Sequence, residues 1–67
     1  MSPPKRAILQ SLADGKSHSS ALARAAALSI LDTQRLVREL ARDGLVVGGP
    51  NGLRITEAGR RALRGEA

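Results

Sequence analysis

The residues best equipped for chemistry in this 67-residue chain are its arginines, nine of the eleven basic residues. Arg35, Arg38 and Arg42 recur every three or four residues, so on a helix they form one row. A guanidinium group keeps its charge and donates paired hydrogen bonds to anions and planar acceptors. The chain has no cysteine, one histidine and only six scattered acidic residues, which provide neither a thiol nucleophile nor a metal site. We therefore expect a binding protein rather than an enzyme, with no metal, no cofactor and no small-molecule effector site.

The composition limits the size of the molecule and of its core. Sixty-seven residues make at most one domain, 1–67, and the formal net charge is +5. Phe, Trp and Tyr are absent, so ten Leu, three Ile and three Val must form the core, with eleven Ala for close helix contacts. A lone core of this size rarely supplies more than about 3–5 kcal/mol. We expect tight helix packing and an oligomer that buries more surface.

No stretch of the chain is suited to a membrane or to secretion. A membrane-spanning helix needs about 18 consecutive apolar residues, and no run in the sequence approaches that length. The first residues, MSPPKR, lack the charged region and apolar stretch of a secretory signal. We expect a cytoplasmic protein.

Two short helices are predicted in the first part of the chain. Ser2-Pro3-Pro4 favours a helix start, and an apolar stripe follows, so we predict a helix over 3–13. Gly15 then serves as a left-handed cap. A second helix is predicted over 19–26, with Leu22, Ala23 and Ala26 inward. Its alternative caps are Ser17, Ser19 and Ser20.

The third helix, over 30–43 and ending at Gly44, has the clearest pattern. Ser29 caps it, with an acid three residues later. Its buried face consists of Thr33, Leu36, Val37 and Leu40. At about 100° per residue, the arginine row centres almost opposite that face. The helix is nevertheless electrically neutral, because its arginines are balanced by Asp32, Glu39 and Asp43.

A hairpin and a last helix complete the predicted order. Residues 45–47 are β-prone, 48–52 are dense in turn residues that include Asn-Gly, and 53–55 form the return strand. Thr56 caps a helix over 57–65. Residues 16–18 are too short for more than a bridge of strand.

These elements resemble a winged helix-turn-helix domain, particularly the MarR-like bacterial transcription regulators. Three stretches carry the resemblance: Ile8-Leu9-Gln10-Ser11-Leu12, the run from Leu22-Ala23 to Gly44-Leu45-Val46, and Leu53-Arg54-Ile55-Thr56-Glu57-Ala58-Gly59-Arg60. The match as a whole extends over nearly the entire chain, and the order and spacing of these stretches are more specific than any single motif. The implied fold is α+β, mostly α: a three-helix core with an antiparallel hairpin wing and a short C-terminal helix.

The resemblance implies a transcriptional regulator that binds double-stranded DNA. The helix over 30–43 would enter the major groove, and the wing, 48–54, would lie on the flanking backbone. A Gln34 amide can pair with adenine, and Arg35 or Arg38 with guanine. The hydroxyls of Ser29 and Thr33, with Arg42 and Arg54, suit phosphates. The predicted contact residues are Ser29, Leu31, Gln34, Arg35, Arg38, Arg42 and Arg54.

Other residues are given broader roles. The resemblance implies a homodimer, with a seam formed by Ala58, Ala62 and Leu63. The positive footprint can be widened by Lys5, Arg6, Lys16, Arg24 and a cluster of Arg60, Arg61 and Arg64, although that cluster more often only aids solubility. His18 is read as a surface or capping residue.

The sequence departs from the family pattern in three ways, and the second and third of them support an alternative. Ala27 stands at the usual turn glycine, which asks for a slightly different turn. Ile30 and Leu31 stand where polar base-reading residues are common, and Leu31 suits either a thymine methyl or a protein contact. The neutral charge of the third helix is the last departure. The alternative is a winged-helix module that binds a protein through this helix.

Overall fold

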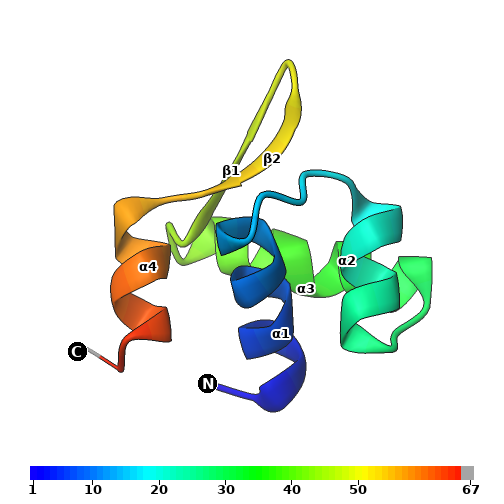
Figure 1. Ribbon diagram of the computed structural model, residues 1–67, viewed down its shortest axis with the longest axis horizontal. Helices are drawn as coiled ribbons and strands as arrows, with labels where there is room; N and C mark the ends of the chain where they lie inside the picture. Colours follow the sequence, from blue (N-terminus) through cyan, green and yellow to red (C-terminus); the bar gives the residue numbers. More distant parts are fainter. Residues whose placement is uncertain (66–67) are drawn as a thin grey trace.

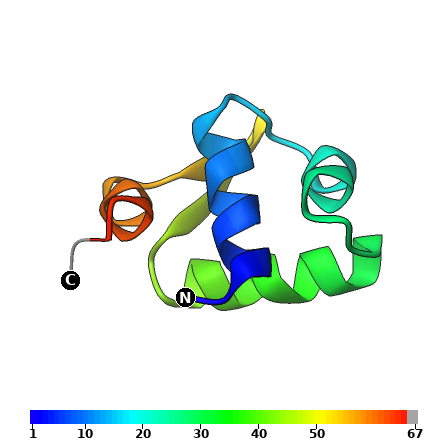
Figure 2. The same ribbon diagram turned by 60° about the horizontal axis from the view of Figure 1, so that its bottom comes forward.

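Residues 1–65, which the computed structural model describes, form four helices and a two-stranded antiparallel sheet (Figure 1). The elements are α1 (Pro3–Ala13), α2 (Ser19–Ala26), α3 (Ile30–Arg42), β1 (Val46–Gly49), β2 (Gly52–Ile55) and α4 (Glu57–Leu63). In Figure 2, α1 lies between α2 and α4, and α3 runs beneath α1 and α2. The predicted order of elements is confirmed, and none of the described helices is long and apolar enough to cross a membrane.

The predicted helix bounds agree closely with the observed ones. α1 and α2 span the predicted residues, whereas α3 ends one residue early because Asp43 is already its C-cap. α4 ends at Leu63, two residues before the predicted end. Gly15, after α1, has the expected positive φ of 104°.

α2 begins at Ser19, as predicted, but its N-cap residue is not a serine; it is His18, which was expected to be a surface or capping residue. His18, exposed and extended, occupies the N-cap position, so the prediction of a cap at Ser17, Ser19 or Ser20 is wrong. No side-chain hydrogen bond caps α2 at His18, nor α1 at its N-cap residue Ser2. Both helices are therefore stabilised by packing more than by caps.

The turn between α2 and α3 corrects a second prediction. Ala27 itself adopts the left-handed conformation, with φ 56° and ψ 43°, at the C-cap of α2. The turn is thus the one that a glycine would make, and the expectation of a different turn is wrong. The Leu28 N–H closes it by bonding the Ala23 carbonyl at 2.9 Å. An L-residue in this conformation costs about 1–2 kcal/mol, which the packing on either side must offset.

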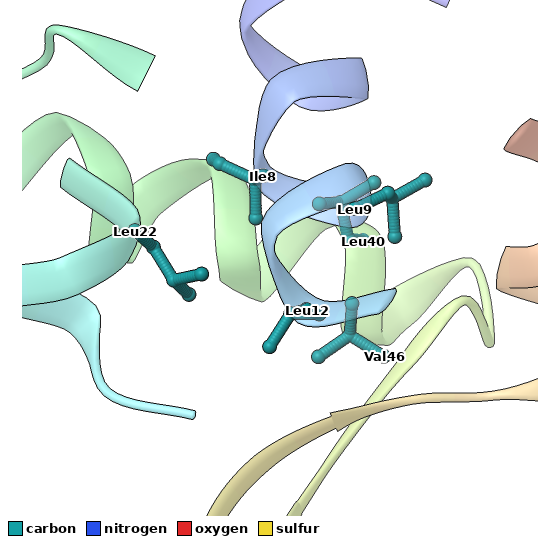
Figure 3. Packing of buried hydrophobic residues seen from close by; sticks show 6 residues of the cluster. All are labelled: Ile8, Leu9, Leu12, Leu22, Leu40 and Val46. Atoms are coloured by element: carbon teal, nitrogen blue, oxygen red, sulfur yellow. The ribbon is translucent and has the colours of Figure 1, made fainter. Parts of the chain in front are cut away.

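A small aliphatic core joins α1 to the other elements. Its buried members are Ile8, Leu9, Leu12, Leu22, Leu40 and Val46 (Figure 3). Half of these come from α1, the helix in the middle of the fold. Leu36 and Val37, which belong to the predicted buried side of α3, are partly buried and pack against this cluster. The core therefore fixes the inner side of α3 against α1.

The hairpin turns within two residues, so its loop is shorter than the predicted turn over 48–52 and its strands are longer than predicted. β1 pairs with β2 from Val46 opposite Ile55 to Gly49 opposite Gly52, so Pro50 and Asn51 form the loop. The positive φ falls on Gly52, at 108°, and not on Asn51, so the turn is not of the type I′ that Asn-Gly favours.

The start of β2, next to the turn of the wing, is fixed to the segment before α2. The Leu53 N–H donates to the Ser17 carbonyl at 2.8 Å. Gly52 lies so close to Ser17 that a Cβ on it would come within 2.6 Å of that carbonyl oxygen. Residues 16–18 form no strand; in place of the predicted bridge, this single backbone hydrogen bond joins the segment to β2.

Thr56 connects the wing to α4 and to the end of α3. Its Oγ1 accepts from the Gly59 N–H at 3.0 Å, which confirms the predicted cap, and donates to the Gly44 carbonyl at 2.7 Å. Gly59 is buried, and a Cβ there would overlap the Leu45 carbonyl oxygen. The wing, the end of α3 and the start of α4 are thereby held together.

Candidate nucleic-acid interface

α3 is held in place at both ends and along its inner side. At its start, Ser29 Oγ accepts a 3.0 Å hydrogen bond from the Asp32 N–H, which confirms the predicted cap. At its end, the Leu45 N–H donates to the Leu40 carbonyl at 2.9 Å. Leu40 and Thr33 are fully buried between these points. The helix is thus a rigid support for whatever its outer side carries.

The outer side of α3 carries most of the predicted contact residues. Leu31, Arg35, Arg38 and Arg42 follow one another at i, i+4, i+7 and i+11, and all four are exposed. At about 100° per residue, this row lies nearly opposite the buried side. Gln34 is also exposed and flanks the row. We call the surface formed by these five side chains the α3 face.

Acidic side chains lie along one edge of the α3 face. Asp32 Oδ1 is 3.8 Å from a terminal guanidinium nitrogen of Arg35, and Glu39 Oε1 is 3.0 Å from Lys5 Nζ of α1. Solvent-exposed ion pairs of this kind contribute about 0–1 kcal/mol and exchange partners easily. A hollow of about 400 Å³ lies alongside, lined by Lys5, Arg35, Arg38, Glu39, Arg42 and Asp43. The charges around this hollow are mixed.

A second hollow has charges of one sign. It measures about 220 Å³ and lies where the end of α1, β2 and α4 meet. Its charged lining residues are Lys16, Arg54 and Arg60; among the residues described, no acid lines it. We call it the basic hollow. Arg54 therefore lines the basic hollow, which shares no lining residue with the hollow beside the α3 face.

Thr33 cannot play the part that the sequence suggested. Its side chain is fully buried on the inner side of α3, and its Oγ1 has no hydrogen-bond partner in the described structure. The prediction that this hydroxyl meets a phosphate is wrong, because Thr33 follows the same helical spacing as Leu36 and Leu40. Ser29 remains exposed, although its hydroxyl already accepts the cap bond.

Several basic side chains outside α3 contact other groups of their own chain. A terminal guanidinium nitrogen of Arg6 donates to the Leu63 carbonyl at 2.6 Å, joining α1 to the end of α4. Glu57 lies 3.8 Å from Arg61 and 3.6 Å from Arg64. Sequence reasoning missed the contacts of Lys5 and Arg6, which join distant residues and leave no local signal.

The predicted dimer seam is only partly exposed. Ala58 is open to solvent, whereas Ala62 and Leu63 are half-buried and pack against the core of their own chain. The seam stays a prediction, with a smaller apolar area than the sequence implied.

The α3 face and the basic hollow offer charged, hydrogen-bonding and apolar groups. Within residues 1–65, no group of three or more His, Cys, Asp or Glu side chains is placed to hold a metal ion. The α3 face presents guanidinium forks, one amide and one large apolar side chain. These groups match the acceptor edges of guanine, the edge of adenine and the thymine methyl.

The fold is a winged helix, as a solved structure shows. A MarR family protein of Mycobacterium tuberculosis matches 96% of this chain with a TM-score of 0.83 and 23% sequence identity. The chain spans 50% of the length of that protein. No protein-family model and no curated protein sequence matches the chain. The resemblance read from the sequence is confirmed in its fold: mostly helical, with a hairpin wing.

Proposed function

We propose that this chain is a DNA-binding module of a transcriptional regulator, which lays α3 in the major groove of duplex DNA. The observation that carries the proposal is the α3 face: five side chains suited to base edges or phosphates, all exposed on a firmly seated helix. A helix fits the major groove, and residues near its N-terminus reach the base edges. The winged-helix fold supports the same role.

Each contact has a chemical assignment. Gln34 pairs with adenine, and Arg35 and Arg38 donate paired hydrogen bonds to guanine. Ser29, Arg42 and Arg54 contact phosphates, which position the protein without reading sequence. Because Arg54 lies in the basic hollow and not on the α3 face, its contact falls on the flanking backbone beside the wing.

The test is duplex binding measured at several salt concentrations. Binding by counterion release gives a Kd that rises steeply with salt. Arg35→Ala should weaken binding to a preferred duplex by about 1–3 kcal/mol. Arg61→Ala is the matched control, since Arg61 lies on α4 beside Glu57 and should change affinity little. A weak affinity that does not vary with salt would overturn the proposal.

A second candidate is a protein-binding module that uses the same helix. Leu31 is 64% exposed and Ile30 is 45% exposed, an unusual pair at the start of such a helix. In this alternative, Leu31→Asp abolishes association with a partner while Arg35→Ala has almost no effect. Loss of DNA binding in Arg35→Ala alone would exclude it.

We propose further that the regulator acts in the cytoplasm as a homodimer, occupying DNA at paired half-sites. The small core and the exposed Ala58 on α4 support an additional interface. Duplexes selected from a random pool should then share a palindrome, whose spacing gives the separation of the two α3 helices. Sedimentation as a monomer at high micromolar concentration, with no change in Tm on dilution, would contradict the dimer.

A further inference from the structure

Two of the exposed large hydrophobic side chains lie together in the first turn of α3. The described chain exposes Met1, Ile30, Leu31 and Val47, and Leu31 is the most exposed of the four. Leu31 does not pack in the core, because it lies on the side of α3 almost opposite the buried side. A single exposed leucine is common at protein surfaces, but Leu31 is set apart by its place in the exposed row that it shares with Gln34 and the arginines.

The neighbours of Leu31 are hydrogen-bonding groups. Gln34 lies three residues after it and Arg35 four residues after it, so both side chains share its side of the helix. An apolar group is therefore set between an amide and a guanidinium group, both exposed. The major groove offers a matching arrangement, in which the C5-methyl group of thymine projects beside hydrogen-bonding base edges.

We propose that Leu31 is a specificity-determining residue that contacts a pyrimidine C5-methyl group in the major groove, next to the base pair read by Gln34. This inference rests on the proposed function and identifies the DNA that α3 prefers. The methyl belongs to thymine or to 5-methylcytosine, which present the same apolar group at C5. Leu31 forms no hydrogen bond, so a pyrimidine without the methyl group leaves it without a partner.

A protein partner fits this surface less well. A partner that covered Leu31 would also cover Arg35 and Arg38, and burying charges without good pairing is costly. A DNA groove provides both kinds of partner at once, since guanine acceptors and phosphates receive the arginines and a methyl group receives the leucine.

The experiment removes the methyl group without changing base pairing. A preferred duplex is first selected from a random pool, and each thymine is then replaced singly by deoxyuridine. Wild-type protein should lose about fourfold in affinity at one or two positions, the value of one buried methyl-sized group. Cytosine at that position should bind weakly, and 5-methylcytosine in its place should recover part of the loss.

Protein variants assign the effect to Leu31. Leu31→Ala should bind the thymine and deoxyuridine duplexes equally. Val47→Ala is the control, because Val47 is an exposed apolar residue on β1 and its removal should leave the fourfold difference intact. Both residues are exposed, so both variants should keep the wild-type Tm.

The outcomes separate this inference from the proposed function. Equal binding to thymine and deoxyuridine at every position, or a methyl effect that persists in Leu31→Ala, overturns the role of Leu31 while DNA binding stands. Failure to bind any duplex overturns the proposed function itself. A change of oligomeric state in Leu31→Ala without a change in methyl dependence assigns the side chain to a protein contact instead.

Discussion

The α3 face and the basic hollow divide the charge of the molecule unequally. On and beside the α3 face, the arginines are accompanied by Asp32, Glu39 and Asp43. Around the basic hollow, Lys16, Arg54 and Arg60 stand without an acid among the lining residues described. The helix that we propose reads the DNA bases is therefore not the region with the most unbalanced charge.

This difference matches two separate tasks in DNA recognition. Phosphate contacts supply affinity that is independent of sequence, whereas base contacts supply discrimination. Under the proposed function, the neutral α3 gains little from non-specific attraction, so its binding depends on hydrogen bonds and apolar contacts in the right places. We infer that the basic hollow contributes affinity and the α3 face contributes specificity.

The largest expected effect comes from neutralising the basic hollow. The triple variant Lys16→Gln, Arg54→Gln and Arg60→Gln should weaken binding to every duplex on the order of a hundredfold at about 0.1 M salt. The slope of log K against log salt should fall by about three, roughly one for each lost phosphate contact. Anisotropy titrations at four salt concentrations measure both. A salt slope identical to that of the wild type would remove the hollow from the interface.

Arg38→Ala should have a smaller and different effect. Losing one bidentate contact to guanine costs about 1–3 kcal/mol on the preferred duplex and relaxes selection at that base pair. Affinity for unrelated duplexes should change much less. Competition between the preferred duplex and a scrambled one gives the ratio directly, and an equal loss on both would assign Arg38 to phosphate.

The two regions also differ in how far sequence reasoning could reach them. The α3 face follows from helical spacing, so Leu31, Gln34 and the arginine row could be predicted together. The basic hollow joins Lys16, Arg54 and Arg60 from three separate elements, and only the packing of α1 against β2 and α4 brings them to one place.

Local geometry explains the remaining errors. Composition could not reveal that Ala27 adopts a left-handed backbone, since alanine favours helix. The hydroxyl of Thr33 suggests a phosphate contact, whereas its spacing with Leu36 and Leu40 predicts a buried side chain, and the structure confirms the burial. Where periodicity and chemical type disagreed, periodicity was the better guide.

Thr33→Val tests the inner side of α3 apart from its outer side. The variant removes a buried hydroxyl that has no partner and keeps nearly the same shape, so stability should rise by about 1–2 kcal/mol. Thermal unfolding should show the higher Tm, and the Kd for DNA should be unchanged. A lower Tm would mean that the hydroxyl makes a contact, for instance with a buried water molecule.

Ala27→Gly should stabilise the turn before α3 by slightly less. Glycine adopts φ near 56° without the steric cost of a Cβ, but its unfolded chain is more flexible, so the net gain should be about 0.5–1 kcal/mol. Ala25→Gly, at an exposed position inside α2, is the matched control and should destabilise by about 0.5–1 kcal/mol. Opposite signs for the two alanines in denaturant melts would confirm the strain, and equal losses would refute it.

The smallest effect on DNA affinity is expected when one acid beside the α3 face is removed, so that its surroundings become more like the acid-free basic hollow. Asp43 lines the hollow beside the α3 face, and Asp43→Asn removes one acid from it. A unit charge about 10 Å from a phosphate contributes about 0.4 kcal/mol in water, so affinity for all duplexes should rise roughly twofold. Because the gain is electrostatic, it should disappear at high salt, where the Debye length is only about 3 Å. A gain in affinity that persisted at about 1 M salt, or one confined to a single DNA sequence, would show that Asp43 acts through a base contact. The difference in charge between the α3 face and the basic hollow would then explain less of their different roles.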